Sequence, residues 1–249
     1  MTGRPHSSWA CGLRAELLRY FSGYSILGIL AFSALVPWFV ANFLGWPDNA
    51  DQLSATENIQ AFWALATSIA IVATFAGSYL VTRESYYGTL RHSVVMSGPV
   101  QLVAVKYAAA LVVGLGTLAA GILAWGASVV FTLTPELRVE LFTPESWRSV
   151  PGVVAASAVA SLWGCSLGWI IRHYYATTIV TMLIPLAVEL PVVANEPEIG
   201  RWLPSGALAG IASLPFEGLL PPGSAFLVSL AWLLAAGACL VAVLQRKEF

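Results

Sequence analysis

The sequence predicts an all-α membrane protein with six transmembrane helices and with both termini in the cytoplasm. Charged residues make up only 10% of the 249 residues and hydrophobic residues 58%, whereas an ordinary soluble domain is roughly 25% charged. Six separate apolar segments are long enough to cross a bilayer, which takes about 20 residues of helix. The basic residues gather on one side of these segments. We therefore treat residues 1–249 as a single transmembrane domain.

The six predicted spans are separated by short polar segments. They are Ser25–Leu44, Ile59–Val81, Leu102–Phe131, Val153–Ile171, Ala176–Ala194 and Ser224–Leu244. The third span is the longest, and we expect it to project from the bilayer. Lys106 lies within its first turns, so this end should stand in the cytoplasm or let the lysine snorkel there.

The charges orient the spans. Nine of the twelve basic residues fall on one side: Arg4, Arg14, Arg19, Arg83, Arg91, Lys106, Arg172, Arg246 and Lys247. Arg138, Arg148 and Arg201 fall on the other side, together with most of the acidic residues. Cytoplasmic loops carry the excess of Lys and Arg. This rule places the basic side, with both termini, in the cytoplasm.

Residues 1–24 precede the first span. The stretch Ser8–Phe21 mixes apolar residues with Arg14, Glu16 and Arg19, which is typical of an amphipathic helix along the inner membrane surface. A plain extension of the first span is the alternative. The apolar run that follows is too long for a cleavable signal and has no small-residue cleavage site, so we expect a signal anchor.

A polar insert follows the second span. Residues 82–92 are charged and rich in tyrosine, and a helix-restart signal, Ser97-Gly98-Pro99, comes shortly after them. A hydrophobic bundle has little use for such a cytoplasmic helix unless something outside the membrane docks against it. The alternative is a solvated helix in a loop.

Patterns for catalysis or metal binding are missing from the sequence. Gly164-Cys165-Ser166-Leu167-Gly168 matches the nucleophile-elbow pattern, with His173 as a nearby base. We reject that interpretation because both glycines continue a run of small residues at intervals of four, which indicates a packing face on a helix. There is no phosphate-binding loop and no H-E-x-x-H. The three cysteines are far apart, which indicates neither a disulfide framework nor a metal site. We expect no catalytic site, no metal site and no nucleic-acid partner.

The fifth span and the segment after it are irregular. Pro185 and Pro191 interrupt the span, and Glu189 is its one acidic residue. A carboxylate at this position is either functional or interfacial. Residues 195–223 are too apolar for a free loop and too rich in proline to span. We expect them to re-enter the outer leaflet as short helices, or else to rest at the interface as an amphipathic flap.

This arrangement resembles the type-2 permeases of ATP-binding-cassette exporters. The local match is Glu84-Ser85-Tyr86-Tyr87-Gly88-Thr89-Leu90, followed by Pro99 and Lys106, which is similar to the family's E-x-x-x-G-T-L run with its downstream proline and lysine. Leu203-Pro204-Ser205-Gly206-Ala207 is similar to the entry of the family's outer re-entrant segment. The architecture covers nearly the whole chain and the motif about 25 residues.

The resemblance implies a coupling helix at Glu84–Met96, within the region 83–98, that docks into a cleft on a separate nucleotide-binding subunit. That subunit would carry ATP and Mg²⁺, and this chain would carry no cofactor. A second permease chain, identical or different, would complete the pore. The residues expected to contact the ATPase are Glu84, Tyr86, Tyr87, Gly88, Thr89, Leu90 and Arg91, with Tyr86, Tyr87, Leu90 and Val94 as an apolar anchor.

The resemblance also places a pathway between the second and fifth spans of two such chains. Its available polar groups are Thr74, Ser78, Thr177, Thr178, Thr181 and Glu189. A pathway this apolar suits an amphipathic substrate, such as an antibiotic, peptide or lipid, exported across a bacterial cytoplasmic membrane; polysaccharide is a second choice. Two rival classes remain: an ion-coupled transporter and a non-catalytic assembly subunit. An ion-coupled transporter would be expected to show an internal repeat and polar residues at mid-membrane.

Overall fold

The computed structural model describes residues 9–46, 49–141, 143–214 and 217–246. Within these ranges every regular element is helical and no strand occurs. Six helices are long and apolar enough to cross a membrane. The predicted all-α class and the six spans are confirmed, and the chain is a multi-pass membrane protein.

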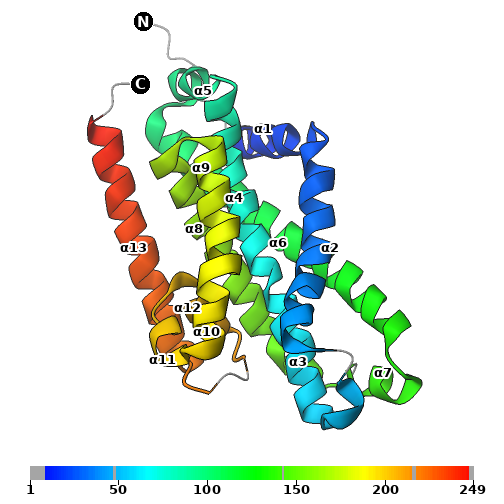
Figure 1. The fold of residues 1–249 in the computed structure, drawn as a ribbon. Helices are drawn as coiled ribbons and strands as arrows, with labels where there is room; N and C mark the ends of the chain where they lie inside the picture. The colour runs from blue at the N-terminus through cyan, green and yellow to red at the C-terminus, as the bar shows by residue number, and fades with distance from the viewer. Residues whose placement is uncertain (1–8, 47–48, 142, 215–216, 247–249) are drawn as a thin grey trace, which may run out of the picture.

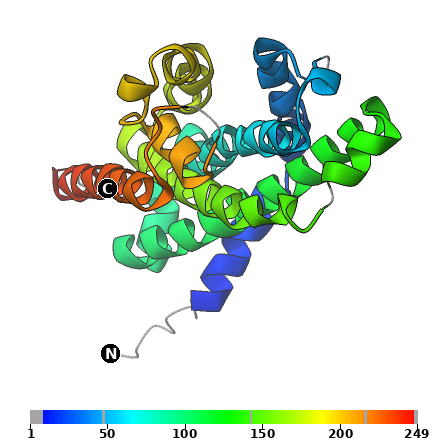
Figure 2. The ribbon, with the colours of Figure 1, turned by 90° about the horizontal axis from the view of Figure 1, so that it is seen from below.

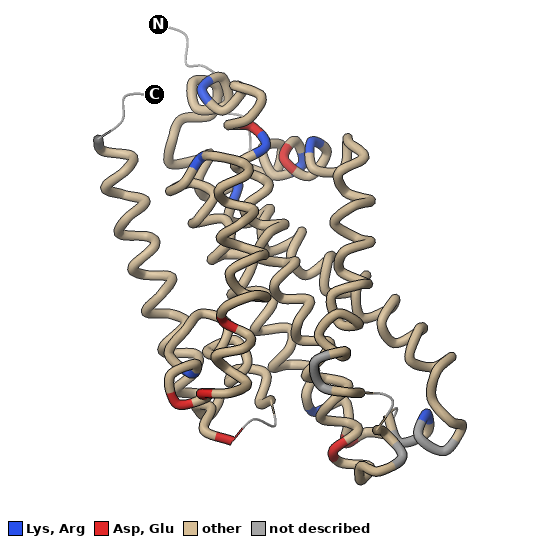
Figure 3. Tube along the Cα trace, viewed as in Figure 1, with Lys and Arg blue, Asp and Glu red and all other residues tan. Residues whose placement is uncertain are grey.

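The spanning helices form an elongated bundle (Figure 1). In chain order they are α2 (Ser25–Leu44), α3 (Ala55–Thr67) continued by α4 (Ile69–Tyr86), α6 (Pro99–Thr132), α8 (Val150–Ile171), the run from α9 (Tyr174–Thr178) to α10 (Leu190–Asn195), and α13 (Pro222–Arg246). Figure 3 shows basic residues concentrated at one end of this bundle, the basic end, and acidic residues concentrated at the other, the acidic end.

Short helices occupy both ends of the bundle. At the basic end, α1 (Trp9–Phe21) lies across the bundle, and α5 (Leu90–Ser97) stands beyond α4 (Figure 1). At the acidic end lie α7 (Pro135–Leu141), α11 (Pro197–Gly200) and α12 (Pro204–Ile211). Residues 195–223 thus contain the expected short helices, while Pro215 and Phe216 lie outside the described residues.

Helix α4 lies at the centre of the bundle, packed against α8 and α6. Seen from the acidic end, α4 and α8 lie in the middle and α13 at one edge (Figure 2). The contact between α4 and α8 depends on glycine. A Cβ atom on Gly164 would sit 1.8 Å from the carbonyl oxygen of Thr74, and one on Gly77 would sit 2.1 Å from that of Ser161. Small residues let two backbones approach in this way in a membrane, as the four-residue spacing in α8 indicates.

Several helix boundaries differ from the prediction by a few residues, and two of them flank the polar insert. The second span does not end at Val81, because α4 continues for five more residues to Tyr86. The third span begins at Pro99 rather than Leu102, since proline suits the first turn of a helix. At 1.5 Å per residue the 34 residues of α6 extend about 51 Å, well beyond the roughly 30 Å of a hydrocarbon core. This length is consistent with the expected projection of α6 from the bilayer.

The fifth span contains the irregularity that its prolines predict. Two segments, Ile179–Leu183 and Pro185–Glu189, adopt π-helical turns between the α-helical ends. Pro185 and Pro191 have no N–H to donate to the preceding turn, so the regular α-helical ladder cannot continue through them. π-Helical turns inside helices occur often at functional sites.

Candidate functional site: a buried charge cluster at the basic end

Lys106 lies fully buried near the beginning of α6, with none of its side chain exposed. Its Nζ is 2.8 Å from Glu16 Oε2, 2.8 Å from the carbonyl oxygen of Leu80 and 3.2 Å from Glu84 Oε1. The Lys106 side chain therefore does not snorkel away from the bundle, while the expected cytoplasmic placement of this end of α6 stays a prediction. Burying an ammonium group is costly unless it is paired and hydrogen-bonded, and here Nζ donates two hydrogen bonds and is paired with two carboxylates.

Arg19 joins the same two carboxylates from the opposite side. Its Nη1 lies 2.9 Å from Glu16 Oε1, 3.0 Å from Glu84 Oε1 and 3.4 Å from Ser93 Oγ. About half of the Arg19 side chain is exposed, so this part of the cluster meets water while Lys106 does not. We call Glu16, Arg19, Glu84 and Lys106 the charge cluster.

The charge cluster connects four helices. Glu16 and Arg19 belong to α1, Glu84 to the last turn of α4, and Lys106 to α6, while Ser93 brings in α5. Two carboxylates face two cations, so the four side chains are electrically balanced. One acceptor remains: Glu84 Oε2 is buried and has no hydrogen-bond partner among the described residues.

A cavity of about 330 Å³, lined largely by residues with polar or charged side chains, adjoins the charge cluster between α1, α4 and α5. Tyr20, Tyr79, Arg83, Tyr87 and His92 line it beside Arg19 and the two carboxylates. Burial raises the pKa of Tyr20 well above its ordinary value, so this phenol keeps its proton. The cavity can hold water or a polar group next to the carboxylate of Glu84.

The inward face of α1 carries a buried carboxylate, and its outward face carries large apolar residues as well as Arg14. Glu16 and Tyr20 are buried, whereas Trp9, Leu18 and Phe21 are exposed. This is the reverse of a helix on a soluble protein and fits a helix that lies along a membrane surface. The extension of the first span into one long helix is excluded, because α1 ends at Phe21 and crosses α2 at a steep angle (Figure 1).

The residues expected on one coupling helix belong to three elements. Glu84 and Tyr86 end α4, Tyr87-Gly88-Thr89 form a turn, and Leu90 and Arg91 begin α5. Gly88 has a φ of 68°, a conformation that favours glycine, and the Thr89 N–H donates to the Glu84 carbonyl at 2.9 Å. The expected single helix Glu84–Met96 was therefore wrong: Gly88 breaks it, and the short helix starts at Leu90.

The exposed apolar residues of this region differ in part from the expected anchor. Leu90 and Val94 are buried against the bundle, so they do not offer a surface to a partner. Tyr86 and Tyr87 are exposed as expected. Val95 and Met96 of α5, which were not among the expected contact residues, are exposed as well. Leu90 and Val94 are four residues apart and so lie on the same face of α5, which is turned toward the bundle. Val95 and Met96 lie on the outward face.

The expected pathway hydroxyls lie within the packing of the bundle. Thr74 and Ser78 are buried in the contact between α4 and α8, and their hydroxyls donate to backbone carbonyls of α4 at 2.9 Å and 2.8 Å. Thr178 and Thr181 donate in the same way within the fifth span. Thr177 is fully buried. The second and fifth spans touch within this one chain, so a pathway between two chains stays a prediction.

Glu189 has a structural partner. Its Oε2 accepts a hydrogen bond of 2.8 Å from the backbone N–H of Ser205, in the first turn of α12. A carboxylate at this place satisfies an otherwise unpaired helix donor and opposes the positive end of the helix dipole. The geometry favours a structural role for this acid, linking the fifth span to the short helices after it.

The nucleophile-elbow interpretation fails on geometry. Ser166 is buried inside the continuous helix α8, where its hydroxyl lies 2.7 Å from that of Tyr107. His173 follows the end of α8 and its Nδ1 accepts from the Ala176 N–H. Neither residue lies at a strand-to-helix turn. Among the described residues no three His, Cys, Asp or Glu side chains are grouped to hold a metal ion.

Comparisons with known proteins give no match to a family model, to a curated protein or to a solved structure.

Proposed function

We propose that this chain is the membrane-spanning subunit of an ATP-driven exporter of the type-2 permease kind, and that a separate ATPase docks on its basic end in the cytoplasm. The observation that carries the proposal is the construction of this end: a short helix with exposed apolar residues, α5, is connected to α1, α4 and α6 through a buried charge cluster. The excess of basic residues at this end supports the cytoplasmic orientation.

The surface chemistry supports a protein partner at this end. Tyr87 and Met96 are about two thirds and three quarters exposed, and Arg91 and His92 are exposed beside them. Aromatic residues, methionine and arginine are enriched in protein interfaces. A patch of this composition at the end of a membrane bundle, outside the apolar span, is better suited to a protein than to lipid.

The charge cluster supports coupling between that partner and the spans. Ser93 of α5 contacts Arg19, and Arg19 contacts the carboxylates that hold Lys106 in α6. A displacement of α5 would therefore be transmitted through these contacts to α1 and α6 as well as to α4. The same helices would carry the movement into the membrane.

We propose an amphipathic substrate, an antibiotic, peptide or lipid, since four of the five pathway hydroxyls, those of Thr74, Ser78, Thr178 and Thr181, donate to backbone carbonyls. A second permease chain, identical to this one or different, would complete the pathway. The site of action would be a bacterial cytoplasmic membrane. The ATPase partner would hold ATP and Mg²⁺.

The partner can be identified by purifying the tagged chain from its native membrane in mild detergent and analysing all co-eluting proteins by mass spectrometry. We expect a stoichiometric soluble protein with nucleotide-binding motifs. Its reproducible absence, while other membrane complexes survive the same detergent, would favour an ion-coupled transporter or a structural subunit instead.

The docking surface can be tested with Tyr87→Asp and Arg91→Glu. Both side chains are exposed, so the fold should be retained while the amount of co-purifying ATPase and its substrate-stimulated activity fall at least several-fold. Arg148→Glu is the matched control, because Arg148 is an exposed arginine at the acidic end. Unchanged co-purification of the ATPase with both variants would remove this surface from the docking role.

A further inference from the structure

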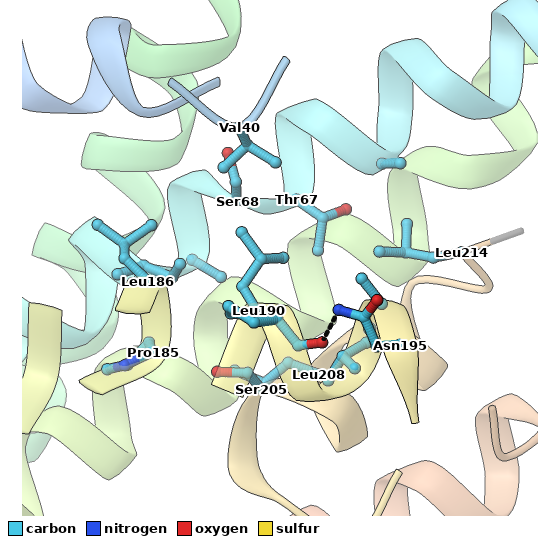
Figure 4. A pocket seen from close by; sticks show the side chains of 17 residues that line it. Val40, Thr67, Ser68, Pro185, Leu186, Leu190, Asn195, Ser205, Leu208 and Leu214 are labelled. Carbon is cyan, nitrogen blue, oxygen red and sulfur yellow. Dashed lines mark hydrogen bonds between the residues drawn. The ribbon is translucent and has the colours of Figure 1, made fainter. Parts of the chain in front are cut away.

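A second cavity, of about 390 Å³, lies toward the acidic end of the bundle. One wall comes from α2, α3 and α4, and the other from the fifth span and α12. Figure 4 shows Val40, Thr67 and Ser68 on one side of the space and Leu190, Leu208 and Asn195 on the other. The cavity thus lies between segments far apart in the sequence and is partly open to the surroundings.

The cavity wall is mainly apolar, and its polar side chains are those of Thr67, Ser68, Asn195 and Ser205. None of the described residues that line it is charged. Thr67 and Ser68 donate to backbone carbonyls of their own helix at 2.8 Å and 2.6 Å, and Asn195 Nδ2 donates to the Pro191 carbonyl at 2.8 Å. Glu189, which is nearby in sequence, is held by the Ser205 N–H.

These properties exclude most occupants. A buried water molecule needs two to four polar partners, and three of the four polar side chains in the wall already donate to backbone carbonyls. A sugar or a peptide would likewise leave its own polar groups unpaired. An engineered apolar cavity of about 150 Å³ stays dry and binds benzene, and this space is more than twice as large. An empty space of this size would also lose many dispersion contacts along its walls.

A hydrocarbon chain fits both the wall and the surroundings. The lining segments belong to helices that span the bilayer, so lipid tails are the solvent at this depth. Ala194 and Asn195, at the end of the fifth span, line the cavity and are exposed, so the cavity is open near this end of the span. The irregular fifth span, with its two prolines and π-helical turns, forms the wall that leaves this space open.

We infer that this cavity is a lipid site, which takes one acyl chain of a phospholipid from the leaflet at the acidic end. The lipid fills the space between α4 and the fifth span and fixes the distance between them. The inference needs no ATPase and no transport activity, because it concerns the chain and its bilayer alone.

A photoactivatable amino acid at Leu208, in the full chain in native membranes, tests the inference, since the mass of the adduct identifies the occupant. We expect a phospholipid adduct. We also expect that Ala64→Leu with Ala70→Leu, which fill the cavity from the opposite wall, lower that adduct several-fold. Ala231→Leu with Ala235→Leu, two exposed alanines on α13, should leave it unchanged.

The same probe at Leu227 provides the reference for ordinary lipid contact, because Leu227 is exposed on α13. Its adduct should not respond to the cavity-filling pair, Ala64→Leu with Ala70→Leu. An adduct of Leu208 with a second copy of the chain or with another protein, no adduct at all, or a lipid adduct that the filled cavity does not reduce would each overturn the inference. If the double variant fails to insert, Ala64→Leu alone gives the same comparison.

Discussion

The middle of α4 and its basic end contact their neighbours through different chemistry. In the middle, Gly77 and Gly164 bring the backbones of α4 and α8 into direct contact without any charged group. At the basic end, Glu84 is held by the long side chains of Lys106 and Arg19. Close packing of small residues permits one arrangement, whereas long charged side chains can follow a displacement and keep their partners. The centre therefore depends on the exact separation of two backbones, whereas the basic end depends on the pairing of charges.

Lys106→Met should have the largest effect on stability. The substitution leaves Glu16 and Glu84 buried with only the half-exposed Arg19 between them, and removing one partner from a buried ion pair typically costs about 3–5 kcal/mol. The free energy of unfolding in detergent measures the loss. Lys106→Met with Glu16→Gln removes one charge of each sign and should recover part of it; a double variant no more stable than the single one would contradict the charge-cluster account.

Gly164→Ala tests the other half of the comparison. Its Cβ would lie 1.8 Å from the Thr74 carbonyl oxygen, so α4 and α8 must separate, and overpacking of this kind costs about 1–3 kcal/mol or more. Gly116→Ala is the matched control in α6, where a Cβ would meet nothing within 4 Å. The control should be neutral or gain about 0.5–1 kcal/mol. Equal thermal stability of the two variants would show that the glycine contact is not tight.

Glu189→Ala should weaken the link between the fifth span and α12. The carboxylate accepts from the Ser205 N–H, and loss of a capping acceptor costs about 1 kcal/mol. Glu189→Gln keeps an acceptor oxygen and should recover most of the thermal stability. If Glu189→Gln abolished transport while the protein remained as stable as the wild type, the acid would have a functional role rather than a structural one.

Arg19→Gln should have the smallest effect on stability. The side chain is about half exposed, and exposed ion pairs contribute roughly 0–1 kcal/mol. The effect should shrink further at high salt, because screening acts on exposed charges. Arg14→Gln, on the exposed side of the same helix, serves as the control. A loss for Arg19→Gln as large as that for Lys106→Met would contradict the division between a buried and a solvated half of the charge cluster.

Length and apolar composition were enough to predict the six spans, because the bilayer requires about 20 apolar residues whatever the neighbours are. The glycine spacing in α8 likewise indicated a packing face, and the contacts with α4 confirm it. The length of a span and the spacing of its small residues can each be read from the sequence of a single helix. The proline-interrupted fifth span belongs to the same class, although its π-helical turns could not be specified.

The charge cluster could not be predicted because its members come from distant parts of the chain. Glu16 and Lys106 are 90 residues apart, and each alone looks like a charge near the membrane surface. The pattern of α1 held one signal, since Glu16 and Tyr20 fall on the same face of that helix. In the polar insert, the sequence identified the region but not that Gly88 would divide it, nor that Leu90 and Val94 would turn inward.

The most direct test of the proposed function is a structure of the native assembly, purified in mild detergent and imaged by electron cryo-microscopy. The account predicts a soluble nucleotide-binding subunit seated on the basic end, in contact with Tyr87, Val95 and Met96, with the charge cluster intact beneath it. A basic end without a partner, or a soluble subunit bound at the acidic end, would contradict it.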